Sequence, residues 1–219
     1  MTTHDLRHIA VFGAGAMSRA VAPHWARPGR VLTVSGRTPA TAEKLAAELG
    51  AEVVPWRAAA EAADVVFLGV HWAGVDDALT AAGADDGTLA GKVIIDCGNP
   101  VEVERFTLVH PERSLTTMVE DRTGARVVKA FNLCHAEVWR RAPRYAGRAV
   151  PVPLAGDDEA AKELVAALVA ETGAAPVDVG GREQAVHLEA AAAVIIRLLF
   201  GGADPTTTFT LTTATPGPA

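Results

Sequence analysis

The chain has 219 residues, of which 49% are hydrophobic and 21% are charged, and its formal net charge is −6 at pH 7. This composition is typical of a soluble globular protein and excludes a disordered one. The acidic balance provides no basic surface, so we expect neither nucleic acid nor an anionic membrane as a partner. The longest apolar run, residues 190–200, contains Arg197 and is too short to span a bilayer, and no secretion signal opens the chain. We therefore expect a cytoplasmic protein.

The first informative feature along the chain is a glycine-rich turn between an apolar run, residues 8–12, and residues at helical spacing. A strand, a tight turn and a helix place backbone N–H groups against a dinucleotide pyrophosphate. Gly13 is expected to form the turn, Gly15 to let the phosphates approach, and Ser18 to supply the small third residue. The predicted cofactor contacts in this segment are Gly13, Ala14, Gly15, Ala16 and Met17.

The end of the next expected strand indicates which dinucleotide binds. Residues 31–34 are followed by Ser35, Gly36, Arg37 and Thr38, about 20 residues past the glycines, where an NAD enzyme carries an acid for the ribose 2′-hydroxyl. No acid occurs at this place, and the next one along the chain is Glu43. A guanidinium and two hydroxyls suit a 2′-phosphate, which a carboxylate would repel. The sequence therefore predicts NADP(H), although an arginine in such a loop is more commonly just solvated.

Strand-like and helix-like runs alternate along the chain, which predicts a parallel sheet covered by helices. Strands are expected over residues 8–12, 31–34, 51–54, 64–70, 92–96 and 126–131, and helices over residues 39–49 and 75–82. The predicted fold class is α/β, a Rossmann doubly wound parallel sheet with a small C-terminal α+β domain. We place a nucleotide-binding domain at residues 1–130 and a smaller acceptor-binding and dimerisation domain at residues 131–219.

The smaller domain has its own expected elements. These are strands near residues 150–156 and 174–179, a helix from about residue 158 to 172, and a long helix over residues 183–200. The long helix is apolar nearly all round, which predicts that it is buried between domains or between subunits. The two cysteines, Cys97 and Cys134, have no metal-ligand or CxxC spacing, so we expect buried thiols and no metal site.

Binding sites of such sheets form where the strands end, so the segments that follow the strands are the candidate site residues. The cofactor is expected to contact Val70, His71, Trp72, Gly98, Asn99 and Pro100. His71 and Trp72 could equally pack their loop onto the next helix, and Asn99 could be a turn residue before proline. Asn132 and His135 are the catalytic candidates, and the alternative for His135 is a structural capping residue.

The acid–base groups of the chain are few. The single tyrosine, Tyr145, has no lysine four residues later, and no nucleophile elbow or paired carboxylates occur. Carbonyl reduction normally needs a positioned acid, whereas hydride transfer between two redox cofactors needs mainly alignment of two rings. The pattern therefore favours transfer between two cofactors.

Several segments together resemble the NADPH-dependent F420 reductases (F420H2:NADP oxidoreductases). The resemblance rests on the glycine turn, residues 35–37, 95–100 and 127–132, and on the more specific blocks 155–162 and 177–181. It implies an NADP domain, a small domain that forms the pocket for the deazaflavin coenzyme F420, and a homodimer. It also implies direct hydride transfer, with Ser35 and Arg37 at the 2′-phosphate and the Asn132–His135 loop beside the acceptor. The loop 133–139 and the segment from Gly201 differ from the usual family pattern.

Two other functions remain open. The chain could reduce an organic imine, ketone or alkene with NADPH, with His135, His187 or Lys129 as the proton donor. It could also bind NADP(H) without turnover, which the few acid–base groups allow.

Overall fold

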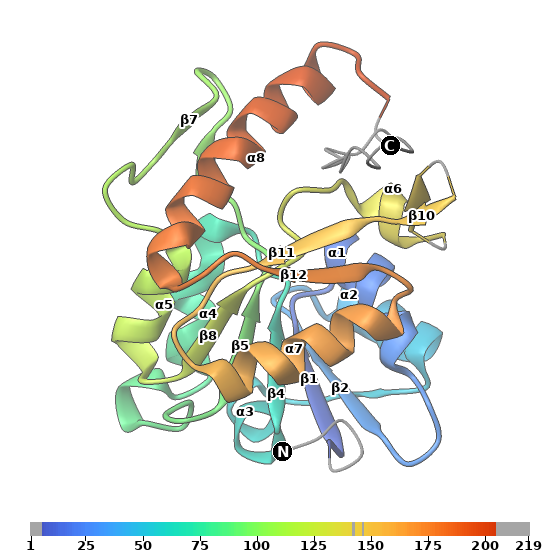
Figure 1. Cartoon of the computed structure of the whole chain (residues 1–219). Coiled ribbons are helices and arrows are strands. Elements are labelled where there is room, and N and C mark those ends of the chain that lie inside the picture. The colour runs from blue at the N-terminus through green and yellow to red at the C-terminus, as the bar shows by residue number, and fades with distance from the viewer. Residues whose placement is uncertain (1–5, 142, 146, 205–219) are drawn as a thin grey trace.

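A computed structural model describes residues 6–141, 143–145 and 147–204 of the protein, and its centre is a six-stranded parallel sheet (Figure 1). The strand order is β3-β2-β1-β4-β5-β8, which confirms the predicted doubly wound α/β fold. The strands are β1 His8–Phe12, β2 Val31–Ser35, β3 Glu52–Val53, β4 Val65–Leu68, β5 Val93–Asp96 and β8 Arg126–Lys129. From β1 the strand order runs outward through β2 to β3, and from β4 it runs outward on the other side through β5 to β8. The carboxyl ends of β1 and β4 therefore flank a topological switch point, where such sheets bind their ligands.

Side chains of the central strands alternate between two hydrophobic clusters. Ile9, Val11 and Phe67 belong to one cluster, and Ala10 and Phe12 belong to the other. The first face is covered by α1 Ala16–Val21, α2 Pro39–Leu49 and α7 Glu159–Glu171. The second is covered by α3 Trp56–Ala62, α4 Val75–Ala81 and α5 Leu115–Thr123. Burial on both faces explains why the strands read as continuous apolar runs.

The helix ends follow local sequence signals. Helix α2 begins at Pro39, whose fixed φ suits a first helical position. It ends at Leu49, and the C-cap residue that follows, Gly50, has a φ of +61°. The prediction for residues 39–49 is therefore confirmed, and α4 ends one residue earlier than predicted. The sequence analysis missed α3 and α5, because α3 is short and α5 carries threonines and charges in place of an apolar stripe.

The chain after residue 130 packs onto the same sheet. It forms α6 Ala136–Trp139, the hairpin β9 Arg144–Tyr145/β10 Arg148–Ala149, β11 Pro151–Leu154, β12 Ala175–Asp178 and α8 Ala185–Phe200. A further hairpin, β6 Val101–Glu102/β7 Thr107–Leu108, lies between β5 and α5 in the sequence. Strands β11 and β12 pair in parallel, and an antiparallel bridge joins Lys129 to Ala155. The indole of Trp25 donates to the carbonyl of Leu168 at 3.0 Å. The hydrophobic core thus continues across residue 130, and the division into two domains stays a prediction.

Helix α8 lies at the top of Figure 1 and packs through only part of its surface. Ala185, Glu189, Ala192 and Ala193 are its buried residues. By contrast, Val194, Leu198 and Phe200 are 61%, 57% and 68% exposed. The predicted burial of this helix is therefore not achieved within one chain.

None of the helices in the described ranges is long and apolar enough to cross a membrane.

Candidate functional site

The main cavity, of about 680 Å³, opens at the carboxyl ends of β1, β2 and β4. It brings together residues that lie far apart in the sequence: Gly13, Ala14, Gly15, Gly36, Arg37, Thr38, Thr41, Trp56, Gly69, Val70, His71, Ala73, Gly74, Asp77, Ala78 and Ala81. The predicted contacts Ala16, Met17, Ser35, Gly98 and Asn99 do not line it. The cavity has the place and the size of a dinucleotide site in a doubly wound sheet.

The glycine turn depends on close backbone packing. Gly13 has a φ of +89°, and a Cβ there would lie 2.6 Å from the carbonyl oxygen of Gly69. A Cβ on Gly69 would in turn lie 2.1 Å from the hydroxyl of Ser18, which is fully buried. This contact explains why the third position of the motif is a small residue. At Gly15 the nearest atom would be 3.7 Å away, so the absence of a side chain there leaves the cavity open rather than relieving a clash.

Alanine substitutions at Gly13 and Gly15 separate the packing role of the first glycine from the binding role of the second. Gly13→Ala is expected to lower the free energy of unfolding by roughly 1–3 kcal/mol, because of its positive φ and the contact with Gly69. Gly15→Ala is expected to leave stability within about 0.5 kcal/mol, because its Cβ meets only ordinary contacts, and to weaken dinucleotide binding. Urea unfolding and titration calorimetry of both variants provide the measurements. Equal destabilisation by the two substitutions would contradict this assignment.

The end of β2 presents a cation to the cavity. Arg37 is exposed and, within the described part of the chain, forms no ion pair, so its guanidinium is available to an anion. Thr38 and Thr41 line the same region. Ser35 instead is 1% exposed, and its hydroxyl donates to the carbonyl of Val54 at 2.8 Å. The structure thus directs the predicted Ser35 hydroxyl into the sheet and adds Thr41.

Trp56 is a site residue that the sequence analysis missed. It begins α3, lines the cavity, and packs edge-to-face on Phe12 with ring centroids 5.0 Å apart. Its position after the short strand β3 gave no signal, because an isolated tryptophan matches no motif. The ring provides an apolar part of the cavity wall.

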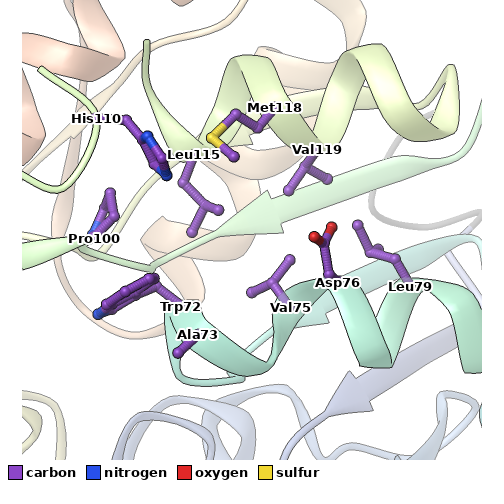
Figure 2. Close-up of a pocket in the computed structure, with 10 residues that line it drawn as sticks. All are labelled: Trp72, Ala73, Val75, Asp76, Leu79, Pro100, His110, Leu115, Met118 and Val119. Atoms are coloured by element: carbon purple, nitrogen blue, oxygen red, sulfur yellow. The ribbon is translucent and has the colours of Figure 1, made fainter. Parts of the chain in front are cut away.

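The segments after β4 and β5 are divided between two cavities. Val70 and His71 line the main one, whereas Trp72 and Pro100 line a smaller cavity of about 140 Å³ between α4 and α5 (Figure 2). His71 Nδ1 accepts a hydrogen bond from the amide of Ala73 at 3.4 Å. His71 therefore contributes to its own turn as well as to the cavity wall.

The segment after β8 begins with a strained residue. Phe131 has a φ of +64°, which a buried contact with the aromatic rings of Trp25, Phe67 and Trp139 maintains. The turn brings Asn132 to Asn99. Asn99 Nδ2 donates to the backbone carbonyl of Asn132 at 2.9 Å, and Asn132 Nδ2 donates to Asn99 Oδ1 at 3.0 Å. Two segments 33 residues apart are thus joined at the sheet edge.

The three proton-donor candidates lie in different environments. His135 is exposed, and its Nδ1 accepts from the amide of Glu137 at 3.3 Å, so it caps α6 in agreement with its structural alternative. His187 is exposed on α8. Lys129 is 0% exposed and has no surface through which to meet a substrate.

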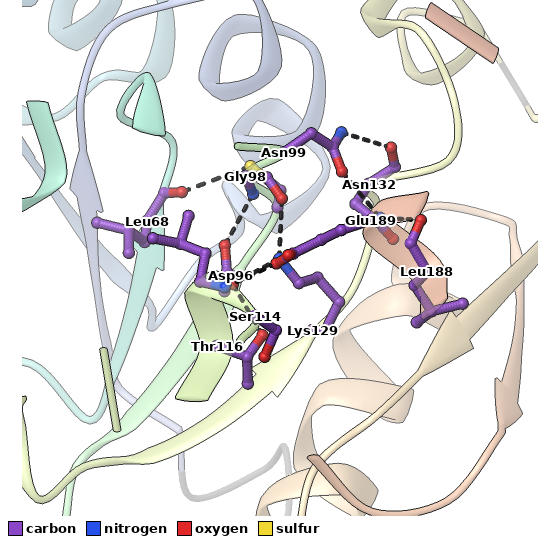
Figure 3. Close-up of polar contacts among 12 residues, drawn as sticks. Leu68, Asp96, Gly98, Asn99, Ser114, Thr116, Lys129, Asn132, Leu188 and Glu189 are labelled. Carbon is purple, nitrogen blue, oxygen red and sulfur yellow. Dashed lines mark hydrogen bonds and ion pairs between the residues drawn. The ribbon is translucent and has the colours of Figure 1, made fainter. Parts of the chain in front are cut away.

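Lys129 instead belongs to a buried ionic cluster that the sequence analysis missed (Figure 3). Its ammonium lies 2.7 Å from Asp96 Oδ2 and 2.6 Å from Glu189 Oε1, and all three side chains are 0% exposed. Burial alone lowers the pKa of Lys129, but the two carboxylates outweigh that effect and raise it. Burial raises the pKa of Glu189, against the attraction of Lys129. A lysine within the apolar run of β8 is the one sequence signal that could have indicated this cluster.

Cys97 lies directly after β5, and the titration of its buried thiol is expected to make protein stability depend on pH. Burial raises the pKa of its thiol from 9.0 to about 12. Between these pH values the unfolded chain loses the proton and the folded protein keeps it, so rising pH favours unfolding by about 1.4 kcal/mol per unit. We expect wild-type stability to fall more steeply above pH 9 than that of Cys97→Ala, measured by urea unfolding at several pH values. Parallel curves for the two proteins would show that the thiol titrates normally.

Comparison with known families decides the class of the protein. Residues 8–100 match the model of a family described as NADP oxidoreductase, coenzyme F420-dependent. This part of the chain is therefore similar to that family. It contains the glycine turn, Arg37 and the segment after β5, so the predicted resemblance is confirmed, as is the expectation of an NADP-dependent oxidoreductase.

Similar proteins extend the likeness beyond the matched segment. A solved structure from Arthrobacter sp. FB24, provisionally described as an F420-dependent NADP reductase, is 28% identical with a TM-score of 0.81, and the match covers 94% of this chain and 99% of that one. The metalloreductase STEAP3 of Rattus norvegicus is 29% identical over 90% of this chain, which spans 38% of that relative. An imine reductase from Myxococcus stipitatus is 20% identical with a TM-score of 0.63, covers 90% of this chain and 62% of its own, and shares the fold.

Proposed function

We propose that this oxidoreductase transfers a hydride between NADPH and the deazaflavin coenzyme F420. The family description supports the proposal for residues 8–100, and the similarity to the Arthrobacter protein extends over nearly all of both chains. The observation that carries its NADPH half furthest is Arg37, which lines the cavity where an NAD enzyme has a carboxylate and forms no ion pair with any described residue.

The residues present fit NADP(H). The open space beside Gly15 leaves room for the pyrophosphate against backbone N–H groups, and Arg37, Thr38 and Thr41 would hold the 2′-phosphate. Trp56 provides an apolar surface for the adenine. When bound, the nicotinamide supplies or accepts the hydride.

The acceptor end is assigned to the segments after β5 and β8. Asn132, held against Asn99, would position the reacting rings, and His135 lies on the neighbouring exposed loop. Neither residue needs to transfer a proton to carbon, because ring-to-ring hydride transfer depends chiefly on alignment at near-attack distance. These remain candidate roles for the two residues.

The direct experiment is to follow NADPH oxidation by absorbance with oxidised F420 as acceptor and with NADH as the control donor. We expect rapid turnover that requires NADPH. Tight NADPH binding without F420 reduction would contradict the acceptor assignment. It would favour an imine, ketone or alkene substrate, or a protein that binds the cofactor without turnover.

We also propose that a second copy of the chain covers α8, as the family resemblance implies. The exposed side chains Val194, Leu198 and Phe200 are large and apolar, and they lie on one helix. At micromolar concentration, light scattering is expected to give twice the mass of one chain, and Leu198→Glu is expected to give a monomer with an unchanged circular dichroism spectrum. A wild-type monomer would contradict the proposal.

A further inference from the structure

The cluster of Asp96, Lys129 and Glu189 is unusual for its composition. Two carboxylates surround one ammonium, all fully buried, where the sheet edge meets α8. Apolar residues of similar size would stabilise such a position as well or better, so a buried ion cluster is weak evidence for a purely stabilising role. Its contacts indicate what else it does.

The cluster holds both backbone groups of Gly98, in the segment after β5. The Gly98 amide donates to Asp96 Oδ1 at 2.8 Å, and the Gly98 carbonyl accepts from Lys129 Nζ at 2.8 Å. A Cβ at this glycine would lie 2.5 Å from the side chain of Leu115, so the segment is also confined sterically. Gly98 therefore has little freedom to move while Lys129 stays in place.

Helix α8 controls the position of Lys129. Glu189 Oε1 accepts from Lys129 (Figure 3). It also accepts from the amide of Leu115 at 2.9 Å, which ties α8 to the beginning of α5. The neighbouring Leu188 carbonyl accepts from Asn132 Nδ2 at 3.1 Å. One turn of α8 thus contacts the segment after β8 directly, and it reaches the segment after β5 through Lys129.

Two buried acceptor atoms at this place are unsatisfied. Glu189 Oε2 and Asn132 Oδ1 have no hydrogen-bond partner among the described residues. Such atoms are rare in native proteins and commonly mark functional strain or a missing donor. Lys129 and Asp96 are the ionisable groups placed against Glu189. Burial and the nearby Asp96 raise the pKa of Glu189, and the ammonium of Lys129 opposes that rise.

We propose that Glu189 is a positioning residue that fixes the Gly98–Asn99 segment for the nicotinamide end of the cofactor, acting from α8 through Lys129. This inference rests on the proposed binding of NADP(H). It adds that α8, beyond the matched segment of the family, sets the geometry of the cofactor's reactive half but not of its adenosine half.

The test compares two ligands by calorimetry, NADPH and adenosine 2′,5′-bisphosphate, which lacks the nicotinamide half. Glu189→Ala is expected to weaken NADPH about tenfold, and to change the bisphosphate less than about twofold. Glu189→Gln keeps the shape and is expected to show the same pattern at about threefold for NADPH. Glu183→Gln, an exposed matched control near the beginning of α8, is expected to change neither affinity.

The outcomes are distinguishable. Equal weakening of both ligands, or no change in either, by a folded Glu189 variant would overturn the positioning role and leave the cofactor assignment intact. If Glu189→Ala does not fold, Glu189→Gln decides the comparison. Failure of wild-type protein to bind the bisphosphate at all would instead contradict the proposed NADP(H) site.

Discussion

Replacing Arg37 with alanine is expected to weaken NADPH binding by about 10- to 100-fold and to leave NADH binding within about twofold. A hydrogen bond to a charged group contributes about 1.5–3 kcal/mol, and each 1.4 kcal/mol is a factor of ten in affinity. Arg37 lines the cavity and forms no ion pair within the described ranges, so its removal leaves no buried partner behind. The effect should therefore depend on the 2′-phosphate alone.

Calorimetric titration of both cofactors measures this difference. Lys44→Ala is the matched control, because Lys44 is an exposed cation on α2 that does not line the cavity. Arg37→Lys should fall between wild type and Arg37→Ala, since an ammonium keeps the charge but not the planar fork. An equal loss of NADPH and NADH affinity in Arg37→Ala would remove the basis of the NADP(H) assignment.

Lys129→Met is expected to be the most destabilising of these substitutions. It leaves Asp96 and Glu189 buried without their shared cation, and breaking a buried pair in this way costs about 3–5 kcal/mol. Protonation of the carboxyl groups offsets part of that cost at low pH, so the loss should be larger at pH 8 than at pH 5. Urea unfolding at the two pH values measures both effects.

The same substitution at Lys162 is the control. Lys162 also has two carboxylate partners, Glu159 and Asp178, at 2.9 Å and 2.8 Å, but these are 77% and 52% exposed. Partners in contact with water are stabilised without the lysine, so Lys162→Met should cost less than about 1 kcal/mol. Similar losses for the two variants would show that burial of the cluster has no special role.

The sequence was sufficient to predict the sheet and several residues of the main cavity because those signals are local. The glycines at 13 and 15, the arginine after β2 and the apolar runs each occupy a few consecutive residues. Their geometry follows from strand, turn and helix preferences, and the close contact of Gly13 with Gly69 explains the requirement for glycine.

The remaining features depend on contacts between distant segments. Lys129 and Glu189 are 60 positions apart, and nothing in either segment indicates that they meet. The hydroxyl of Ser35 donates to the carbonyl of Val54, directly after β3, and the sequence around Ser35 does not reveal this contact. Trp56 similarly becomes a wall of the cavity only when α3 packs beside β1.

The most direct test of the central claim uses NADPH deuterated at the transferred position of the nicotinamide C4, with oxidised F420 as acceptor. Direct transfer between aligned rings predicts that the deuterium appears on a carbon of the reduced deazaflavin, detected by mass spectrometry, and that NADH supports little reaction. Deuterium that appears in water, or the absence of F420 reduction by bound NADPH, would contradict the proposed reaction.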